Sequence, residues 1–148
     1  DEIADVMAAS GAPWMHAYTY SAHPVGCAVA LAMLDIVEKE DFPAQAASKG
    51  ARLINGLQDA LGDHAHVGEV RGLGLMAAVE IVKDKETGEE FDASESVGAR
   101  ILAAGTDRGL FSRTRGDVYV IAPPIVTTES EIDKIVEIMH DSVVAVLG

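Results

Sequence analysis

Hydrophobic residues recur every three or four positions in five stretches of the chain, and this spacing is typical of helices that bury one face. In the last stretch, the sequence Thr128-Glu129-Ser130-Glu131 has the form of an N-terminal capping box. The second stretch carries Asp35 as its only charge before Glu38, so we expect it to be buried on most of its surface. The predicted helices are 1–10, 24–39, 43–61, 92–108 and 128–146.

Apolar and polar residues alternate in four shorter stretches, as they do in half-buried strands. The predicted strands are 67–71, 75–82, 110–113 and 118–122. Gly72 and Gly74 permit a bend between the first two, and Pro123-Pro124 ends the last one because proline lacks an N–H. From residue 43 onward this order predicts an α+β domain with a mainly antiparallel sheet covered by helices on one face.

Composition narrows the class of protein. The 148 residues are 49% hydrophobic, which is enough for a real core, and the formal charge is −13. Nucleic acids and anionic membranes bind basic faces, so the acidity argues against both as partners. The single cysteine, Cys27, cannot form an internal disulfide, and the chain opens without a basic leader. We therefore expect a cytoplasmic protein.

The richest local chemistry lies between Met15 and Val25, where two tyrosines, two histidines, a threonine and a serine precede an apolar helix. A helix start offers unpaired backbone N–H groups and partial positive charge, which suit an anion. The Thr19 and Ser21 hydroxyls can add donors there. The plainer alternative is that Ser21 or His23 only caps the helix, with Pro24 in its first turn.

The loop His-Ala-Tyr-Thr-Tyr-Ser-Ala-His-Pro resembles the signature loop of the class III aminotransferases, which are pyridoxal-phosphate enzymes of fold type I. Later motifs of that family follow in the family's order; they are Val70 to Met76, Gly109-Leu110, Arg113, Gly116-Asp117 and Ala122-Pro123-Pro124. The family usually has glycine where this chain has Ala17 and Ala22. Glycine would allow positive φ or a close backbone approach at those positions.

The resemblance implies a division of the chain and a partner. Residues 1–24 would end the large cofactor domain, 25–42 would form the long linking helix, and 43–148 would form the C-terminal small domain of the aminotransferase. In the family, the threonine of the loop reaches across a homodimer to the cofactor phosphate of the other subunit, and Thr19 matches it. The expected partners are a small-molecule amino donor and a keto acid.

Three other groups of residues are candidates for chemistry. Arg113 aligns with the arginine that holds substrate carboxylates in many class III enzymes, and a guanidinium matches a carboxylate with two hydrogen bonds. For Arg71, a structural ion pair with an acidic neighbour is the favoured interpretation. His64 and His66 suggest a metal site, but their surroundings supply neither a cysteine nor a carboxylate pair, so we assign no metal.

Pyridoxal-phosphate catalysis needs a lysine that forms a Schiff base with the cofactor. None of the five lysines of this chain is expected in a pocket, and the family's lysine precedes the threonine loop. The sequence therefore predicts an aminotransferase fragment, with that lysine upstream of Asp1, that is inactive alone. An aminomutase or decarboxylase of the same fold, or a noncatalytic ligand-binding or regulatory module, remains as the alternative.

Overall fold

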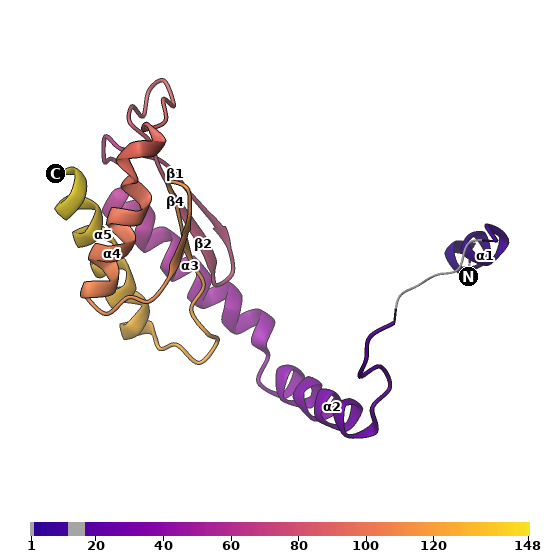
Figure 1. Cartoon of the computed structure of the whole chain (residues 1–148). Helices are drawn as coiled ribbons and strands as arrows, with labels where there is room; N and C mark the ends of the chain where they lie inside the picture. The colour runs from indigo at the N-terminus through magenta and orange to yellow at the C-terminus, as the bar shows by residue number, and fades with distance from the viewer. Residues whose placement is uncertain (1, 12–16) are drawn as a thin grey trace. The chain divides into compact units, whose positions relative to one another are not determined.

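The computed structural model describes residues 2–11 and 17–148 (Figure 1). Asp1 and residues 12–16 lie outside this description, and with them His16, the first residue of the signature loop. The elements are α1 (Glu2–Ala9), α2 (Pro24–Lys39), α3 (Phe42–Leu61), β1 (Val67–Leu73), β2 (Met76–Ile81), η1 (Ala93–Glu95), α4 (Val97–Asp107), β3 (Arg113–Arg115), β4 (Val118–Ile121) and α5 (Glu129–Leu147).

The chain divides into two units, Asp1–Glu40 and Asp41–Gly148. The first contains α1, the signature loop and α2, and α2 spans the predicted range. Our expectation that this helix is mostly buried is wrong for the chain as described, because α2 has no buried residue. Its large apolar side chains find no partner within this short unit; those of Val25, Val29, Leu31, Met33, Leu34 and Ile36 are exposed.

The second unit has the predicted α+β fold. Its four strands form one antiparallel sheet in the order β1-β2-β4-β3, and α3, α4 and α5 lie beside it (Figure 1). Alternate strand residues point toward the helices and are buried, as the strand pattern predicted for Leu75, Ala77, Val79 and Ile81. They join side chains from all three helices in one core, which includes Leu53, Leu57, Leu61, Ile101, Tyr119, Ile121, Ile132, Met139 and Val143.

The strand predicted at 110–113 begins later, and β3 is Arg113–Arg115. Pairing with β4 starts at Arg113, which lies opposite Val120. If the same register continued, Leu110 and Gly109 would lie opposite Pro123 and Pro124, which have no N–H to donate to a ladder. Gly109, at φ +93°, instead directs this segment out of the sheet.

The helix predicted at 92–108 is interrupted. Asp92 and Glu95 form a capping box around the short η1 turn, and Ser96 then takes a left-handed conformation with φ +50°. The longer helix α4 restarts at Val97, where the Gly98 N–H donates to Asp117 Oδ1 at 2.7 Å. The capping box predicted at Thr128 is present at the start of α5.

Candidate cofactor and substrate site

The loop before α2 is built around a tight turn. The Ser21 N–H donates to the Tyr18 carbonyl at 3.0 Å, and the Tyr18 N–H donates back to Ser21 Oγ at 3.1 Å. These reciprocal bonds place Thr19 and Tyr20 at the tip of the turn, where both are exposed. The Thr19 hydroxyl forms no hydrogen bond within residues 2–11 and 17–148. It is therefore available to an external acceptor.

The start of α2 shows which capping interpretation holds. His23 is the N-cap residue, and its Nδ1 accepts a hydrogen bond from the Gly26 N–H at 3.4 Å. Pro24 occupies the first turn, as predicted. Ser21 does not cap the helix; its oxygen is used by Tyr18, which leaves its O–H proton free to donate.

Ala22 holds the backbone of this loop in an uncommon state. Its φ is +58°, the left-handed region that costs an L-residue with a Cβ roughly 1 kcal/mol or more. This is one of the two positions at which the sequence carries alanine in place of the family's glycine. The loop thus adopts the conformation that glycine would favour.

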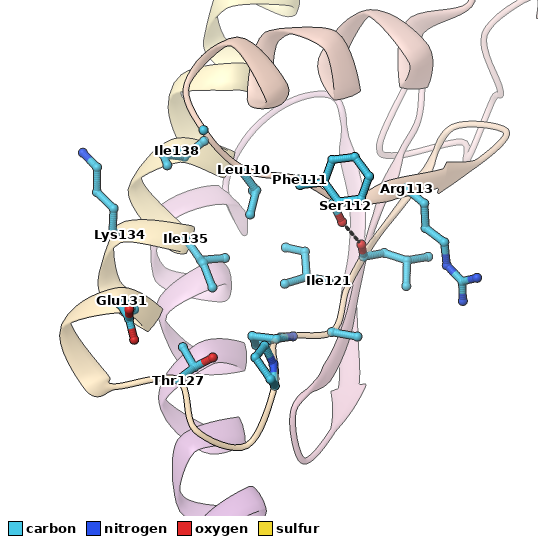
Figure 2. Close-up of a pocket in the computed structure, with 15 residues that line it drawn as sticks. Leu110, Phe111, Ser112, Arg113, Ile121, Thr127, Glu131, Lys134, Ile135 and Ile138 are labelled. Carbon is cyan, nitrogen blue, oxygen red and sulfur yellow. Dashed lines mark hydrogen bonds between the residues drawn. The ribbon is translucent and has the colours of Figure 1, made fainter.

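Arg113 begins β3 and belongs to the second unit. Its side chain is exposed and extends away from Leu110, Ile121 and Ile135 (Figure 2). Neither the ion pairs nor the hydrogen bonds of the described residues include its guanidinium. The described part of the chain therefore gives Arg113 no acidic partner.

A cavity of 730 Å³ lies between the end of β4 and α5, and Arg113 is among the residues that line it. Its walls are mostly apolar, and Pro123 and Pro124 are among them. Figure 2 shows Leu110, Ile121, Ile135 and Ile138 around its interior. β4 ends before the two prolines, at Ile121, as the sequence predicted.

Comparison with known proteins identifies the family. The family model for aminotransferase class-III matches residues 1–143. The chain belongs to the class III aminotransferases. It is 47% identical over 134 residues to an uncharacterized aminotransferase of Sinorhizobium fredii, and 44% identical over 126 residues to the diaminobutyrate–2-oxoglutarate transaminase of Halomonas elongata. These matches cover 89% and 84% of this chain but only 29% and 27% of the relatives' own lengths.

Solved structures of this family have the same fold. A thermostable (S)-enantioselective omega-transaminase from Thermomicrobium roseum matches with a TM-score of 0.87 and 41% identity, over 100% of this chain and 33% of that one. An amine transaminase from an uncultivated Pseudomonas species, in its pyridoxal-phosphate-bound form, matches with a TM-score of 0.82 and 41% identity over 90% of this chain and 30% of that one. The chain therefore spans about a third of a class III aminotransferase.

Four of the five lysines of this class III chain donate to nearby acceptors, and the position of one of them differs from our expectation. Lys134 lines the cavity, so our expectation that no lysine lies in a pocket is wrong for it. Its amine is nevertheless directed away from the interior and pairs with Glu137 at 2.9 Å (Figure 2). Lys49 donates to the Ile125 carbonyl at 2.6 Å, Lys85 donates to the Gly62 carbonyl, and Lys83 pairs with Glu89.

Arg71 has the structural role favoured from the sequence. Its guanidinium pairs with Glu69 at 2.7 Å and Glu80 at 2.8 Å, and these bonds raise its pKa. All three side chains lie on the open face of the sheet, because Glu69 is opposite Glu80 and Arg71 is opposite Ala78. The Arg71 guanidinium therefore forms a structural ion pair with two glutamates of the sheet.

His64 and His66 are held by the backbone. His64 Nδ1 accepts from the His66 N–H at 3.1 Å, and His66 Nδ1 donates to the Val82 and Lys83 carbonyls at 3.2 and 2.9 Å. Among the described residues, no group of three or more histidine, cysteine, aspartate or glutamate side chains could hold a metal ion.

Within residues 2–11 and 17–148, no helix is long and apolar enough to cross a bilayer.

The sequence placed Arg115 in the turn after the predicted strand and gave it no role, whereas the structure places it in β3. The residue lies two positions after Arg113 in the same strand and is also exposed. The strand prediction ended at Arg113, so the alternation that relates the two arginines was not visible. With the correct bounds of β3, the spacing alone would have drawn attention to it.

Proposed function

We propose that this chain is the C-terminal part of a pyridoxal-phosphate-dependent aminotransferase. The enzyme would move an amino group between an amine or amino acid and a keto acid, and would work as a homodimer. The observation that carries this proposal is the exposed Thr19 hydroxyl, which has no partner within the described residues and lies at the tip of a turn in the family's signature loop.

The donors of this loop fit a phosphate group. The Thr19 O–H and the Ser21 O–H are both free to donate, and phosphate oxygens only accept. At the start of α2, Pro24 has no N–H, the Gly26 N–H is used by His23, and the Cys27 N–H donates to the His23 carbonyl. The Val25 N–H remains as the orphan donor of this helix start. In the homodimer, Thr19 and Ser21 would bind the cofactor phosphate in the partner subunit's site.

Arg113 would hold the carboxylate of the substrate. Its exposed guanidinium has no ion-pair partner in the described part of the chain, so binding a substrate breaks no existing ion pair there. A bidentate pair fixes both the position and the plane of a carboxylate. Pyridoxal phosphate itself supplies the electron-withdrawing ring on which amino transfer depends.

The lysine that carries the cofactor is proposed to lie outside this chain. Four of the five lysines have acceptors within the described residues. Lys83 and Lys134 pair with carboxylates, and Lys49 and Lys85 donate to backbone carbonyls. For Lys83, the bond to Glu89 raises the pKa, which is the opposite of what a nucleophilic amine requires. The chain by itself is therefore proposed to be inactive.

The test is made on the full-length gene product that contains this chain. We expect amino transfer from a panel of amines and amino acids to at least one keto acid, and Thr19→Ala should weaken the affinity for pyridoxal phosphate about tenfold, because one charge-assisted hydrogen bond is lost. Thr19→Ser keeps the hydroxyl and should retain most of the affinity. No amino transfer, or equal cofactor affinity in wild type and Thr19→Ala, would overturn the proposal.

A further inference from the structure

Two arginines project from the same side of β3. Residues alternate between the two faces of a strand, so Arg113 and Arg115 share a face and Thr114 points the other way. Thr114 lies opposite Tyr119, which is buried in the core, whereas Arg113 and Arg115 lie opposite Val120 and Val118. Two residues of strand separate the Cα atoms of the arginines by roughly 6.6 Å. Both guanidiniums therefore project from the open face of the sheet as neighbours.

Neither guanidinium has an ion-pair partner within residues 2–11 and 17–148. This is unexpected in a chain with 24 acidic residues and 11 basic ones. Two of the other arginines do have carboxylate partners, since Arg52 binds Asp133 and Glu129 and Arg71 binds Glu69 and Glu80. Arg100 and Arg108 form no ion pair among the described residues. Two adjacent positive charges without a carboxylate repel one another, and an anion that contacts both relieves that repulsion.

The neighbouring strands leave room for such an anion. On the open face, β4 contributes Val118 and Val120, which carry no charge. One strand further, these valines lie opposite Glu80 and Ala78 of β2. Glu80 is already held by Arg71 at 2.8 Å. The arginine pair thus stands beside the uncharged side chains of β4, and Glu80 beyond them is engaged by Arg71. Glu90 and Asp117 line the same hollow as Arg115, but within the described residues neither forms an ion pair with it.

We propose that Arg115 is a second carboxylate receptor beside Arg113, so that the keto acid bound here is a short dicarboxylate. Each guanidinium would bind one carboxylate through two hydrogen bonds, and a monocarboxylate would fill only one of them. Arg115 is then the residue that favours dicarboxylate over monocarboxylate acceptors. This proposal rests on the proposed function, in which Arg113 binds substrate.

The direct test measures binding to this chain without any chemistry. Glutarate, a dicarboxylate without a keto group, and butyrate, a monocarboxylate of similar chain, are titrated at low salt, and the arginine side-chain N–H signals are followed by NMR. We expect glutarate to bind about tenfold more tightly than butyrate, because one further charge-assisted pair forms. Arg115→Gln should remove this preference and leave butyrate binding unchanged.

Arg100→Gln is the matched control, since Arg100 is an exposed arginine of α4 whose guanidinium is likewise unpaired within the described residues. It has no arginine two residues away on a shared strand face. This variant should keep the full preference for glutarate. A preference that survives Arg115→Gln, or that falls equally in Arg100→Gln, would overturn the proposal.

The full-length enzyme separates failure of this proposal from failure of the proposed function. Arg115→Gln should lower kcat/KM for a dicarboxylate keto acid about tenfold, through KM, and leave kcat/KM for a monocarboxylate keto acid unchanged. Equal effects on both acceptors would contradict the role of Arg115 while amino transfer stands. A glutarate preference in an enzyme that transfers no amino group would support the arginine pair and contradict the aminotransferase.

Discussion

At the scale of single residues, Ala22 adopts a left-handed backbone conformation that is unfavourable for alanine. Its φ of +58° suits glycine, and the family usually has glycine there. Ala22→Gly removes the strain of a left-handed alanine but adds freedom to the unfolded loop, so the net gain is modest. We expect amide exchange at Ser21 and His23, whose N–H groups hydrogen-bond within the loop, to slow by up to about fivefold.

Ala17→Gly is the control for this prediction, because Ala17 is not among the described residues with positive φ. Glycine there relieves no strain and only adds freedom. Exchange at Ser21 and His23 should stay the same or become faster. If Ala22→Gly and Ala17→Gly behave alike, the strain assigned to Ala22 is not real.

His64 makes the fold sensitive to acid. Burial, followed by the charges of His66, His140 and Lys85, lowers its pKa from 6.5. Its Nδ1 accepts the His66 N–H, so a proton there would break that bond, and its Nε2 is buried without a hydrogen-bond partner in the described structure. The folded state therefore binds the proton less readily than the unfolded state does.

This difference in proton binding between the two states makes the free energy of unfolding depend on pH. Above its ordinary pKa, His64 does not reduce the free energy of unfolding. Below about pH 6.5 the unfolded chain takes up the proton before the folded chain does, so the free energy of unfolding falls. Urea unfolding of the chain between pH 7.5 and 5 should show this decrease, on top of the contributions of other groups. His64→Gln should flatten it relative to wild type. An identical pH profile for wild type and His64→Gln would contradict the assignment.

At the scale of elements, helix α3 meets the turn between β1 and β2 at a glycine. A Cβ on Gly50 would lie 2.1 Å from the Gly74 carbonyl oxygen, which is backbone and cannot move aside easily. Gly50→Ala should therefore lower the free energy of unfolding by at least about 2 kcal/mol, as overpacking does. Chemical denaturation of the chain measures this.

Gly56→Ala is the same substitution in the same helix. Its Cβ would meet Val136 Cγ2 at 3.0 Å, the end of a side chain, and the better helix propensity of alanine offsets that contact. We expect a change within about 1 kcal/mol. Equal losses at Gly50 and Gly56 would mean that the approach to Gly74 is not what constrains α3.

The same elements show what the sequence could and could not predict. The bounds of α2 and the capping box of α5 were predictable because they depend on local residues, namely Pro24 and the Thr128 to Glu131 motif. The start of β3 was not, because it depends on which residues of β4 can still pair before the prolines. For the same reason the sequence pointed to Arg113 but not to Arg115. Thr19 was recognised by resemblance and Ser21 by its hydroxyl in the same loop, and their roles stay predictions.

At the scale of the whole molecule, the two units differ in what holds them together. Every residue of the hydrophobic core lies in Asp41–Gly148, and neither α1 nor α2 has a buried residue. A chain that begins at Asp41 should therefore unfold cooperatively, with a Tm within about 3 °C of that of the 148-residue chain. Calorimetry of the two chains decides this, and a much lower Tm for the shorter one would show that the first unit stabilises the core.

The proposal that the cofactor-binding lysine lies outside this chain is tested most directly by labelling the chain with pyridoxal phosphate. The chain is mixed with the cofactor, reduced with borohydride and mapped by peptide mass, because reduction fixes the cofactor on any lysine that binds it. If the chain supplies only the phosphate donors and the carboxylate receptor, none of its five lysines should be labelled stoichiometrically. A stoichiometric adduct on one lysine, Lys134 in the cavity included, would contradict the account.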